Sequence, residues 1–389
     1  MKRSSERILT THVGSLARPT ALLDVMRAKE QGEPYDEAAY ADLIRDAVAE
    51  VVRKQTACGI DVVSDGEQGK VNFISYVEER LSGYEPSGEG GAIRAPSWSR
   101  EAAAFPEYYA DYFGKYSSAI KALVPLAATG PVRYVGEAAL QMDIGNLKAA
   151  LATVTVEEAF MPATIPEGVG SNKFYATEDE YDAAVADALG VEYRAIVDAG
   201  LVLQIDDPLL AELLNEDPHV EMGERRRGAQ RHVDRLNLGL RGLPEDRLRY
   251  HACYGLNQGP RIHDAALRDV VDFMLQVPAQ AYSFEFANPR HMHEWHVWEE
   301  VRLPPGKVLI PGFISHGTSF VEHPHLIADG IETFARLVGR ENVIAGADCG
   351  FSSRATYKPE IHPRIVWAKF AALAEGARLA SARLWGRRD

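Results

Sequence analysis

Short apolar, β-branched runs alternate with longer segments of helical period along the whole chain. Strands that alternate with helices in this way form a parallel sheet, because each helix carries the chain back to the same edge. The alternation therefore predicts an α/β fold, specifically a (β/α)8 TIM barrel. Nine runs are expected to be strands, one more than the barrel needs, so that either 132–135 or 159–164 is peripheral: 8–14, 60–64, 132–135, 159–164, 201–205, 248–254, 282–286, 308–314 and 343–347.

The 389 residues are expected to form one barrel domain, 1–389, with loop insertions at about 83–115 and 213–247. The first insertion is rich in Gly, Glu and Ser and then in aromatic residues, a composition that suits a lid or an oligomer contact. The second contains the charged run 224–227, which is typical of a solvated helix face. No linker divides the chain into independent domains, and a homo-oligomer is compatible with the sequence.

The charge balance argues against a nucleic-acid partner. The chain has 42 Lys and Arg against 56 Asp and Glu, a net charge of −14, so it has no overall basic field. No run approaches the roughly 18 apolar residues that a membrane span needs, and the polar start 1–7 leads into no apolar signal region. We therefore expect a cytoplasmic protein with no membrane partner.

Polar residues follow the expected strands, where the carboxyl ends of parallel strands converge on one face and form the active site of a barrel enzyme. These residues are His12 to Ser15, Asp65 to Glu67, Asp206, Asp207, His251, Cys253, Glu285, Ser315, His316, Asp348 and Cys349.

Two of the three cysteines in the chain belong to this set. His251 and Cys253 are two residues apart on a strand, so their side chains project to the same face. Glu285 and Cys349 end other strands, and the four side chains offer the N, S and O ligands that zinc accepts. The alternative is that Cys253 and Cys349 are small buried hydrophobic residues, but their joint position beside His251 favours a metal. A zinc ion with two thiolates and a carboxylate is electron-rich, and it suits binding of a substrate thiol better than activation of water.

The remaining candidates carry simpler interpretations. Cys58 lies inside an expected helix and is predicted to be an ordinary core thiol. His291, His293 and His296 do not have HExxH spacing, so we expect a helix surface there rather than a second metal site.

In their order along the chain, these motifs resemble the catalytic barrel of cobalamin-independent methionine synthase and its single-barrel relatives, which include the epoxyalkane:coenzyme M transferases. The resemblance runs nearly end to end, through Thr10-Thr11-His12-Val13-Gly14-Ser15, Ser64-Asp65-Gly66-Glu67, Leu203-Gln204-Ile205-Asp206-Asp207-Pro208, His251-Ala252-Cys253-Tyr254, Ser283-Phe284-Glu285 and Ala347-Asp348-Cys349-Gly350-Phe351. It implies a barrel of the uroporphyrinogen decarboxylase/methionine synthase type that transfers an alkyl group, most often methyl, to a zinc-bound thiolate.

The resemblance also implies a role for each matching residue. The zinc ligands would be His251, Cys253, Glu285 and Cys349. The ammonium group of homocysteine would be held by Glu67 and Asp206, its carboxylate would be received around Gly14 and Ser15, and His12 would line the pocket. His316 would deliver a proton to the leaving group. Structural alternatives remain open. Asp206 or Asp207, just ahead of Pro208, can cap the next helix, and Glu67 can pair with Lys70.

The thiol and the donor are not fixed by these motifs. Methyl transfer to homocysteine, giving methionine, is favoured by Glu67 and Asp206, whereas an anionic thiol such as 2-mercaptoethanesulfonate would need basic residues such as Arg18 or Arg354. A decarboxylase and a non-catalytic zinc protein are more distant alternatives. The run 133–137 lacks the tryptophan of the family's folate segment, which counts against a methyl-folate donor.

Overall fold

The computed structural model of the chain describes residues 1–88, 96–116, 119–121, 124–215, 217, 219–255 and 258–386. Eight of its strands form one parallel sheet in the order β1-β11-β10-β9-β8-β7-β5-β2. A bridge between Thr11 and Val62 joins the two edge strands, so the sheet closes into the expected barrel. The strands are β1 (Leu9–Thr10), β2 (Val62–Val63), β5 (Glu158–Thr164), β7 (Val202–Asp207), β8 (Leu248–Ala252), β9 (Ala281–Phe284), β10 (Val308–Ile314) and β11 (Ile344–Ala347).

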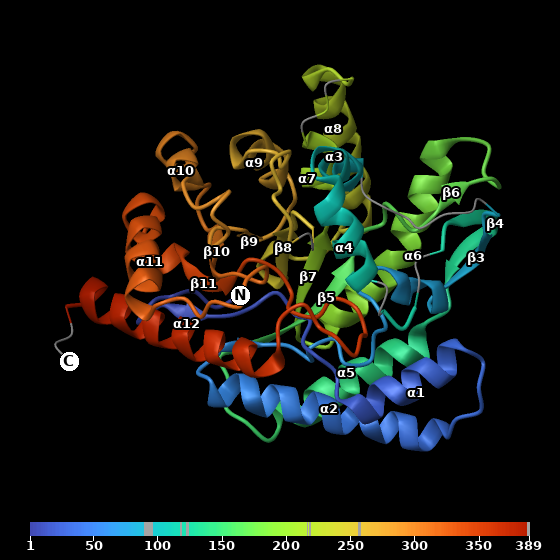
Figure 1. The fold of residues 1–389 in the computed structure, drawn as a ribbon, viewed down its shortest axis with the longest axis horizontal. Coiled ribbons are helices and arrows are strands. Elements are labelled where there is room, and N and C mark those ends of the chain that lie inside the picture. The colour runs from blue at the N-terminus through green and yellow to red at the C-terminus, as the bar shows by residue number, and fades with distance from the viewer. Residues whose placement is uncertain are drawn as a thin grey trace.

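Helices enclose the barrel, as Figure 1 shows with the strands at the centre and α2 and α12 along the lower edge. The α-helices are α1 (Thr20–Glu30), α2 (Glu37–Ala57), α5 (Glu137–Leu151), α6 (Glu178–Asp198), α7 (Leu210–Leu214), α8 (Met222–Gly239), α9 (Leu267–Met274), α10 (Val297–Glu300), α11 (Pro324–Val338) and α12 (Pro363–Leu384). Short 3-10 helices are η1 (Ser75–Glu79), η2 (Glu245–Arg247), η3 (Glu294–His296) and η4 (Arg340–Asn342). Local capping fixes several of these starts; the carboxylate of Asp36, for example, accepts the backbone N–H groups of Ala38 and Ala39 at the start of α2.

A second, three-stranded sheet lies outside the barrel. Strand β4 (Leu126–Tyr134) pairs antiparallel with β3 (Leu81–Pro86) and parallel with β6 (Ser171–Asn172). This sheet accounts for the surplus run, because most of 132–135 belongs to β4 while 159–164 belongs to barrel strand β5.

The two segments that were expected to be insertions both contain helices. Within 83–115, residues 89–95 are outside the described residues, and the rest includes β3, α3 (Pro96–Ala104) and α4 (Pro106–Tyr116). The segment 213–247 includes α8, which packs against α6 and α7. Its apolar face is buried through Ala229, Val233 and Leu236.

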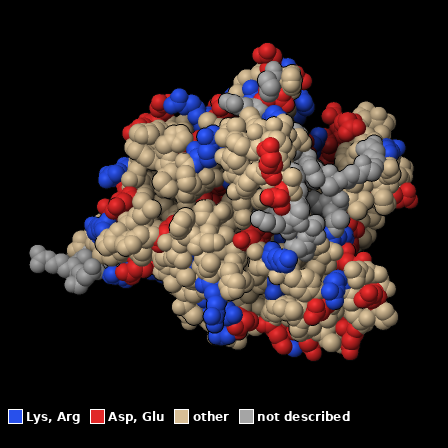
Figure 2. All heavy atoms as spheres, viewed as in Figure 1, with Lys and Arg blue, Asp and Glu red and all other residues tan. Residues whose placement is uncertain are grey.

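The layer between strands and helices forms one large hydrophobic cluster, and two smaller clusters of barrel-strand residues lie apart from it: Leu9, Ala281, Val308, Ile310 and Ile344, and Val62, Phe160 and Val202. Every residue of β10 is buried, as expected for a strand covered on both faces. None of the described helices combines the length and hydropathy required to cross a bilayer. On the face shown in Figure 2, acidic and basic side chains are interspersed around a largely uncharged centre.

Candidate metal and substrate site

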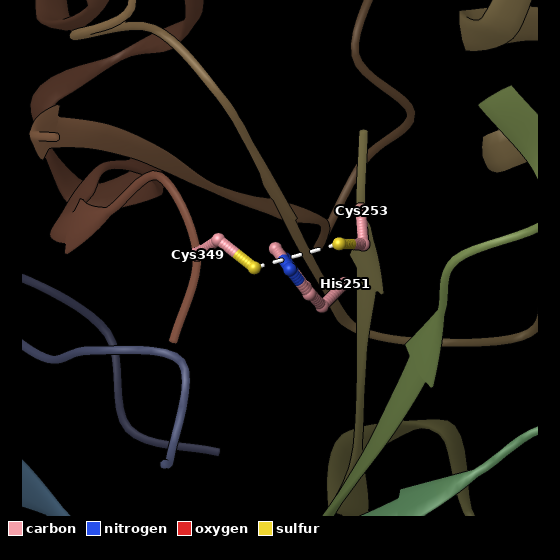
Figure 3. Close-up of side chains that lie close together, drawn as sticks. All are labelled: His251, Cys253 and Cys349. Atoms are coloured by element: carbon pink, nitrogen blue, oxygen red, sulfur yellow. Dashed lines mark hydrogen bonds between the residues drawn. The ribbon is translucent and has the colours of Figure 1, made fainter. Parts of the chain in front are cut away.

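Three predicted metal ligands meet where β8 and β11 end. His251 lies on β8, Cys253 follows that strand, and Cys349 follows β11. The two Sγ atoms are 3.4 Å apart, and one ligand atom from each of the three residues lies within 4.8 Å of the others (Figure 3). The Nε2 atom of His251 is buried and has no hydrogen-bond partner. A buried imidazole nitrogen facing two sulfur atoms is a donor set that fits a soft or borderline metal ion such as zinc.

The electrostatics of this cluster favour a thiolate. The hydrogen bond that Cys349 donates lowers the pKa of Cys253 well below its usual value, against the opposing effect of burial and with help from His251. The same hydrogen bond raises the pKa of Cys349. Burial tends to lower the pKa of His251, but the neighbouring sulfur of Cys253 outweighs burial and raises the pKa. These shifts favour the thiolate form of Cys253, and the thiolate is the form that binds metals.

The fourth predicted ligand, Glu285, has a different partner. Among the described residues it does not belong to the three-residue group. Its carboxylate oxygens accept hydrogen bonds from Nη1 of Arg261 at 3.2 and 2.9 Å, and Asn288 donates to one of them at 3.0 Å. Burial tends to raise the pKa of Glu285, but the guanidinium outweighs it and lowers the pKa to about 2. Ligation by Glu285 remains a prediction.

A small cavity of about 20 Å³ opens beside the cluster and is bounded by the predicted substrate-binding acids. Its lining residues are Val13, Ser15, Glu67, Phe73, Asp206, His251, Cys253, Cys349, Gly350 and Ser353. The described part of this lining contains two carboxylates and neither Lys nor Arg. The two carboxylates suit a ligand that carries a cationic group. The thiol of such a ligand would lie toward the cysteines.

Asp206 and Asp207 point to opposite sides of β7. Asp206 lines the cavity and accepts a 2.6 Å hydrogen bond from Nε2 of Gln204, and burial raises its pKa to about 7. Asp207 accepts the backbone N–H groups of Leu209 and Leu210 and caps the turn that leads into α7. The capping alternative thus applies to Asp207.

Glu67 is held in place by an unusual backbone conformation. Its φ of +54° is rare for a residue with a side chain, and its N–H donates to Oδ1 of Asp65 at 3.0 Å. Nζ of Lys70 lies 3.5 Å from Oε1 of Glu67, so the expected pair forms while Glu67 still lines the cavity. The guanidinium of Arg18 donates to the carbonyls of Glu67 and Lys70 and therefore braces this turn.

The segment after β1 brings backbone close to the cavity. Gly14 has a φ of +140°, and a Cβ atom at this position would lie 2.7 Å from Cγ of Pro162, so only glycine fits. Ser15 lines the cavity, and its hydroxyl lies 3.2 Å from that of Ser353. His12 lies behind the cavity wall, where Nε2 contacts Oε1 of Gln55 at 2.7 Å and Nδ1 accepts the N–H of Gly14.

His316 follows β10 and is 3% exposed. Neither of its ring nitrogens has a hydrogen-bond partner. Burial lowers its pKa, and the charges of Glu285 and Cys253 act in the opposite direction, which places the imidazole in the field of the metal cluster. A buried imidazole with both nitrogens available is suited to bind or transfer a proton.

A larger cavity of about 510 Å³ is bounded by the residue after His316, by the loop after β11 and by α4. Its lining residues are Tyr108, Asp111, Tyr112, Ala119, Gln258, Gly317, Arg354, Thr356, Lys358, Pro359 and Glu360. The rings of Tyr108 and Tyr112 are stacked, with centroids 5.8 Å apart. Arg354, considered for an anionic thiol, therefore lines this cavity and not the smaller one.

Sequence reasoning missed several residues at the site. Arg261 lies in the loop after β8 and Phe73 in the loop after β2, and neither position ends a strand. Lys70 was identified only as a partner of Glu67, yet its Nζ also donates to the carbonyl of Pro162 at 2.6 Å. One weak sequence signal pointed to Arg261. It is a basic residue that lies along the chain between the predicted ligand Cys253 and Glu285, so it is a candidate partner for that acid.

The chain is similar in sequence to known proteins. The family described as the catalytic domain of cobalamin-independent synthase matches residues 8–111, which include Ser15 and Glu67. A methionine synthase of Sulfolobus acidocaldarius is 25% identical over 248 residues, which are 63% of this chain and 61% of that protein's length. A methionine synthase of Thermococcus kodakarensis is 21% identical over 379 residues, covering 96% of this chain and 94% of that protein.

The fold has a counterpart among solved structures. A B12-independent methionine synthase from Shewanella sp. W3-18-1, solved in complex with selenomethionine, superposes with a TM-score of 0.70 at 18% identity. The superposition covers 98% of this chain and 99% of that one. At this identity the likeness supports the barrel fold.

Proposed function

We propose that this chain, which is similar to cobalamin-independent methionine synthases, transfers a methyl group to the sulfur of homocysteine, giving methionine. The observation that carries the proposal is the small cavity in which Glu67 and Asp206 lie beside His251, Cys253 and Cys349. Homocysteine combines a thiol with an ammonium group, and this cavity combines a metal-binding cluster with two carboxylates.

A zinc ion held by His251, Cys253 and Cys349 would lower the pKa of the substrate thiol while leaving its sulfur nucleophilic. The chain's own residues would set the geometry of the reaction. Glu67 and Asp206 bind the ammonium group, and the hydroxyl of Ser15 donates to the substrate carboxylate. Fixing both ends of a small amino acid orients its sulfur toward the donor.

Asp206 and His316 would handle charge and protons. A bound ammonium group favours the ionised form of Asp206, whose pKa of about 7 otherwise leaves it partly protonated at neutral pH. His316 would deliver a proton from a ring nitrogen to the leaving group. Its lowered pKa keeps the imidazole mainly neutral at neutral pH, so His316 would first take up the proton that it then passes to the leaving group.

The larger cavity supplies space for the methyl donor. At about 510 Å³ it falls in the range of ordinary small-molecule sites. It adjoins Gly317, the neighbour of His316, and offers stacked tyrosines with side chains of both charges. We propose that the donor binds here and presents its methyl group toward the smaller cavity.

The test is anaerobic titration calorimetry of the zinc-loaded protein with homocysteine, 4-mercaptobutanoate and 2-mercaptoethanesulfonate. The second thiol lacks only the ammonium group, and the third is an anionic alternative. We expect homocysteine to bind at least about tenfold more tightly than 4-mercaptobutanoate, because it alone forms the charged hydrogen bonds to Glu67 and Asp206. Buffers of different ionisation enthalpy should report proton release from the thiol. Preference for the sulfonate, or no binding of any thiol, would contradict the proposal.

A further inference from the structure

A fully buried arginine crosses the interior of the barrel, two residues deeper along β8 than His251. Arg249 and His251 project to the same face of this strand. Arg249 is 0% exposed, and its Cζ atom lies 4.0 Å from the centre of the Phe160 ring on β5. Arginine is almost never fully buried unless it is paired. The groups that this guanidinium binds therefore indicate its role.

Arg249 binds the end of the strand on the opposite side of the barrel. Three strands separate β8 from β1 in either direction around the sheet. Nη1 of Arg249 donates to Oγ1 of Thr11 at 3.0 Å, and Nη2 donates to the carbonyl of His12 at 2.7 Å. Both acceptors are neutral, so these contacts are hydrogen bonds and not an ion pair. The guanidinium thus holds the backbone that leaves β1.

Gln204 on β7 holds the next carbonyl. Its Nε2 atom donates to the carbonyl of Val13 and, at 2.6 Å, to Oδ1 of Asp206. Strand β1 covers only Leu9–Thr10, so it ends before this segment. A buried carbonyl without a donor costs free energy, and the carbonyls that follow β1 therefore need other partners. Arg249 and Gln204 supply these partners from inside the barrel.

The two held carbonyls come just before the turn that is proposed to receive the substrate carboxylate, Gly14-Ser15. Gly14 has no room for a side chain, and Ser15 lines the small cavity. Because the carbonyls of His12 and Val13 are both bound, this turn cannot shift without breaking a buried hydrogen bond. A group that binds a ligand has to be held within about 0.5 Å of its productive position. The interior contacts provide that restraint.

We propose that Arg249 and Gln204 are positioning residues that hold the Gly14-Ser15 turn where it receives the carboxylate of the substrate. The inference rests on the proposed function, because it takes the substrate to be a thiol that carries a carboxylate. Arg249 then sets the affinity for the carboxylate end of a thiol and leaves the affinity for its ammonium end unchanged.

The test is anaerobic calorimetry of the zinc-loaded protein with three thiols that differ in their charged groups. Homocysteine carries both groups, 4-mercaptobutanoate only the carboxylate, and 3-aminopropane-1-thiol only the ammonium group. We expect Arg249→Met to bind homocysteine and 4-mercaptobutanoate about tenfold more weakly, because a hydrogen bond to a charged group is lost. Its affinity for 3-aminopropane-1-thiol should stay within about twofold of the wild type, because Glu67 and Asp206 are unchanged. A merely structural role would not produce this selective loss.

Arg235→Met is the matched control. It makes the same change of side chain on α8, where Arg235 pairs with Glu167 and Asp182 outside the barrel. This variant should have a lower melting temperature and wild-type affinity for all three thiols. Metal analysis should give the wild-type zinc content for Arg249→Met, since Arg249 donates to the end of β1 and not to the metal cluster.

The outcomes separate this inference from the proposed function. If the wild type binds neither homocysteine nor 4-mercaptobutanoate, both fall. If the wild type binds them but Arg249→Met weakens all three thiols equally, or none of them, only the role of Arg249 is overturned.

A second variant keeps the inference testable should Arg249→Met fail to fold. Gln204→Met removes the donor to Val13, and 4-mercaptobutanoate has no ammonium group for Asp206 to bind. The affinity of Gln204→Met for this thiol therefore reports on the turn alone, and it should fall about tenfold. An unchanged affinity would overturn the proposal.

Discussion

Neighbouring residues on one barrel strand have opposite roles at this site. Asp206 faces the small cavity, where burial raises its pKa to about 7. Asp207 faces the helices; burial tends to raise its pKa, but His232 and Tyr250 outweigh that effect and lower it. Successive side chains of a strand point to opposite faces, so an Asp-Asp pair places only one carboxylate where a substrate can reach it.

This division predicts the effect of Asp206→Asn. The variant should bind homocysteine about 10- to 100-fold more weakly, because it loses a charged hydrogen bond to the ammonium group. Its zinc content should equal that of the wild type, since Asp206 is not in the metal cluster. Calorimetry measures the first quantity and metal analysis the second. Affinity for 4-mercaptobutanoate, which has no ammonium group, serves as the internal control, and an equal loss for both thiols would refute the assigned contact.

The residues of the site differ in how far the sequence could identify them. The rule that polar side chains follow barrel strands located Glu67, Asp206 and the three-residue metal group. It could not locate Arg261, which donates to Glu285 from a loop whose backbone N–H groups are accepted by Glu101 on α3. The positive φ of Glu67 was also inaccessible, because such a conformation in a residue with a side chain is imposed by tertiary contacts.

At the scale of elements, a buried ionic network joins β7 to α8. His232 on α8 lies between Asp207 and Glu167, with Nε2 2.5 Å from Asp207, and the hydroxyl of Tyr250 donates to the same carboxylate. Burial tends to lower the pKa of His232, but the two acids outweigh burial and raise it to about 10. Helix α8, whose charged run 224–227 was expected to face solvent, therefore also carries a buried cation at His232.

The network predicts a pH-dependent stability. The pKa of His232 is near 6.5 when unfolded and about 10 when folded, so its contribution is complete below pH 6.5 and is lost as pH rises toward 10. Between pH 7 and 9, the stabilising contribution of His232 to the free energy of unfolding should fall by up to about 1.4 kcal/mol for each unit that the pH rises. Urea denaturation of wild type and His232→Gln checks this, because the difference between them should shrink over that range. A constant difference would contradict the raised pKa.

Helix α3, which lies in the first expected insertion, holds the loop after β8 by hydrogen bonds. Glu101 on α3 is 2% exposed and accepts the N–H groups of Arg261 and His263 at 3.1 and 3.2 Å. Glu101→Ala should therefore expose those two amides and speed their hydrogen exchange by about fivefold or more, given about 1 kcal/mol for each hydrogen bond. Exchange mass spectrometry of peptides spanning 258–264 measures this. Peptides of α12 are the control, and unchanged exchange in both regions would mean that α3 does not hold the loop.

At the scale of the whole molecule, the sequence predicted the barrel more fully than the three-stranded sheet outside it. Buried strands such as β10 appear in the sequence as uninterrupted apolar runs, and its predicted bounds, 308–314, coincide with those observed. Strands β1 and β2 contain two residues each and are shorter than the expected runs 8–14 and 60–64. Their pairing stops where the chain turns toward the cavity. Of the outer sheet, only 132–135, most of which belongs to β4, was expected as a strand. Strands β3 and β6 were missed, since strands of a small outer sheet are only partly buried and lack a continuous apolar signal.

An ion bound by His251, Cys253 and Cys349 would act on the whole molecule, because these residues come from parts of the barrel that are not adjacent. Cys253 follows β8 and Cys349 follows β11, and β9 and β10 lie between those strands in the sheet. An ion that binds only the folded chain stabilises it by mass action, by about 2.7 kcal/mol at one hundred times its dissociation constant. Added zinc should therefore raise the melting temperature of the wild type.

Cysteine variants distinguish this cross-link from nonspecific metal binding. Cys349→Ser and His251→Ala should lose both bound zinc and the zinc-dependent rise in melting temperature, because each removes one of the three clustered ligands. Cys58→Ser is the matched control: its backbone N–H caps the end of α2 and its thiol donates to the carbonyl of Trp367, away from the cluster, so the full rise should persist. Thermal melts with and without zinc, combined with metal analysis, make the comparison. An equal rise in all four proteins would mean that zinc stabilises the chain from somewhere other than the ends of β8 and β11.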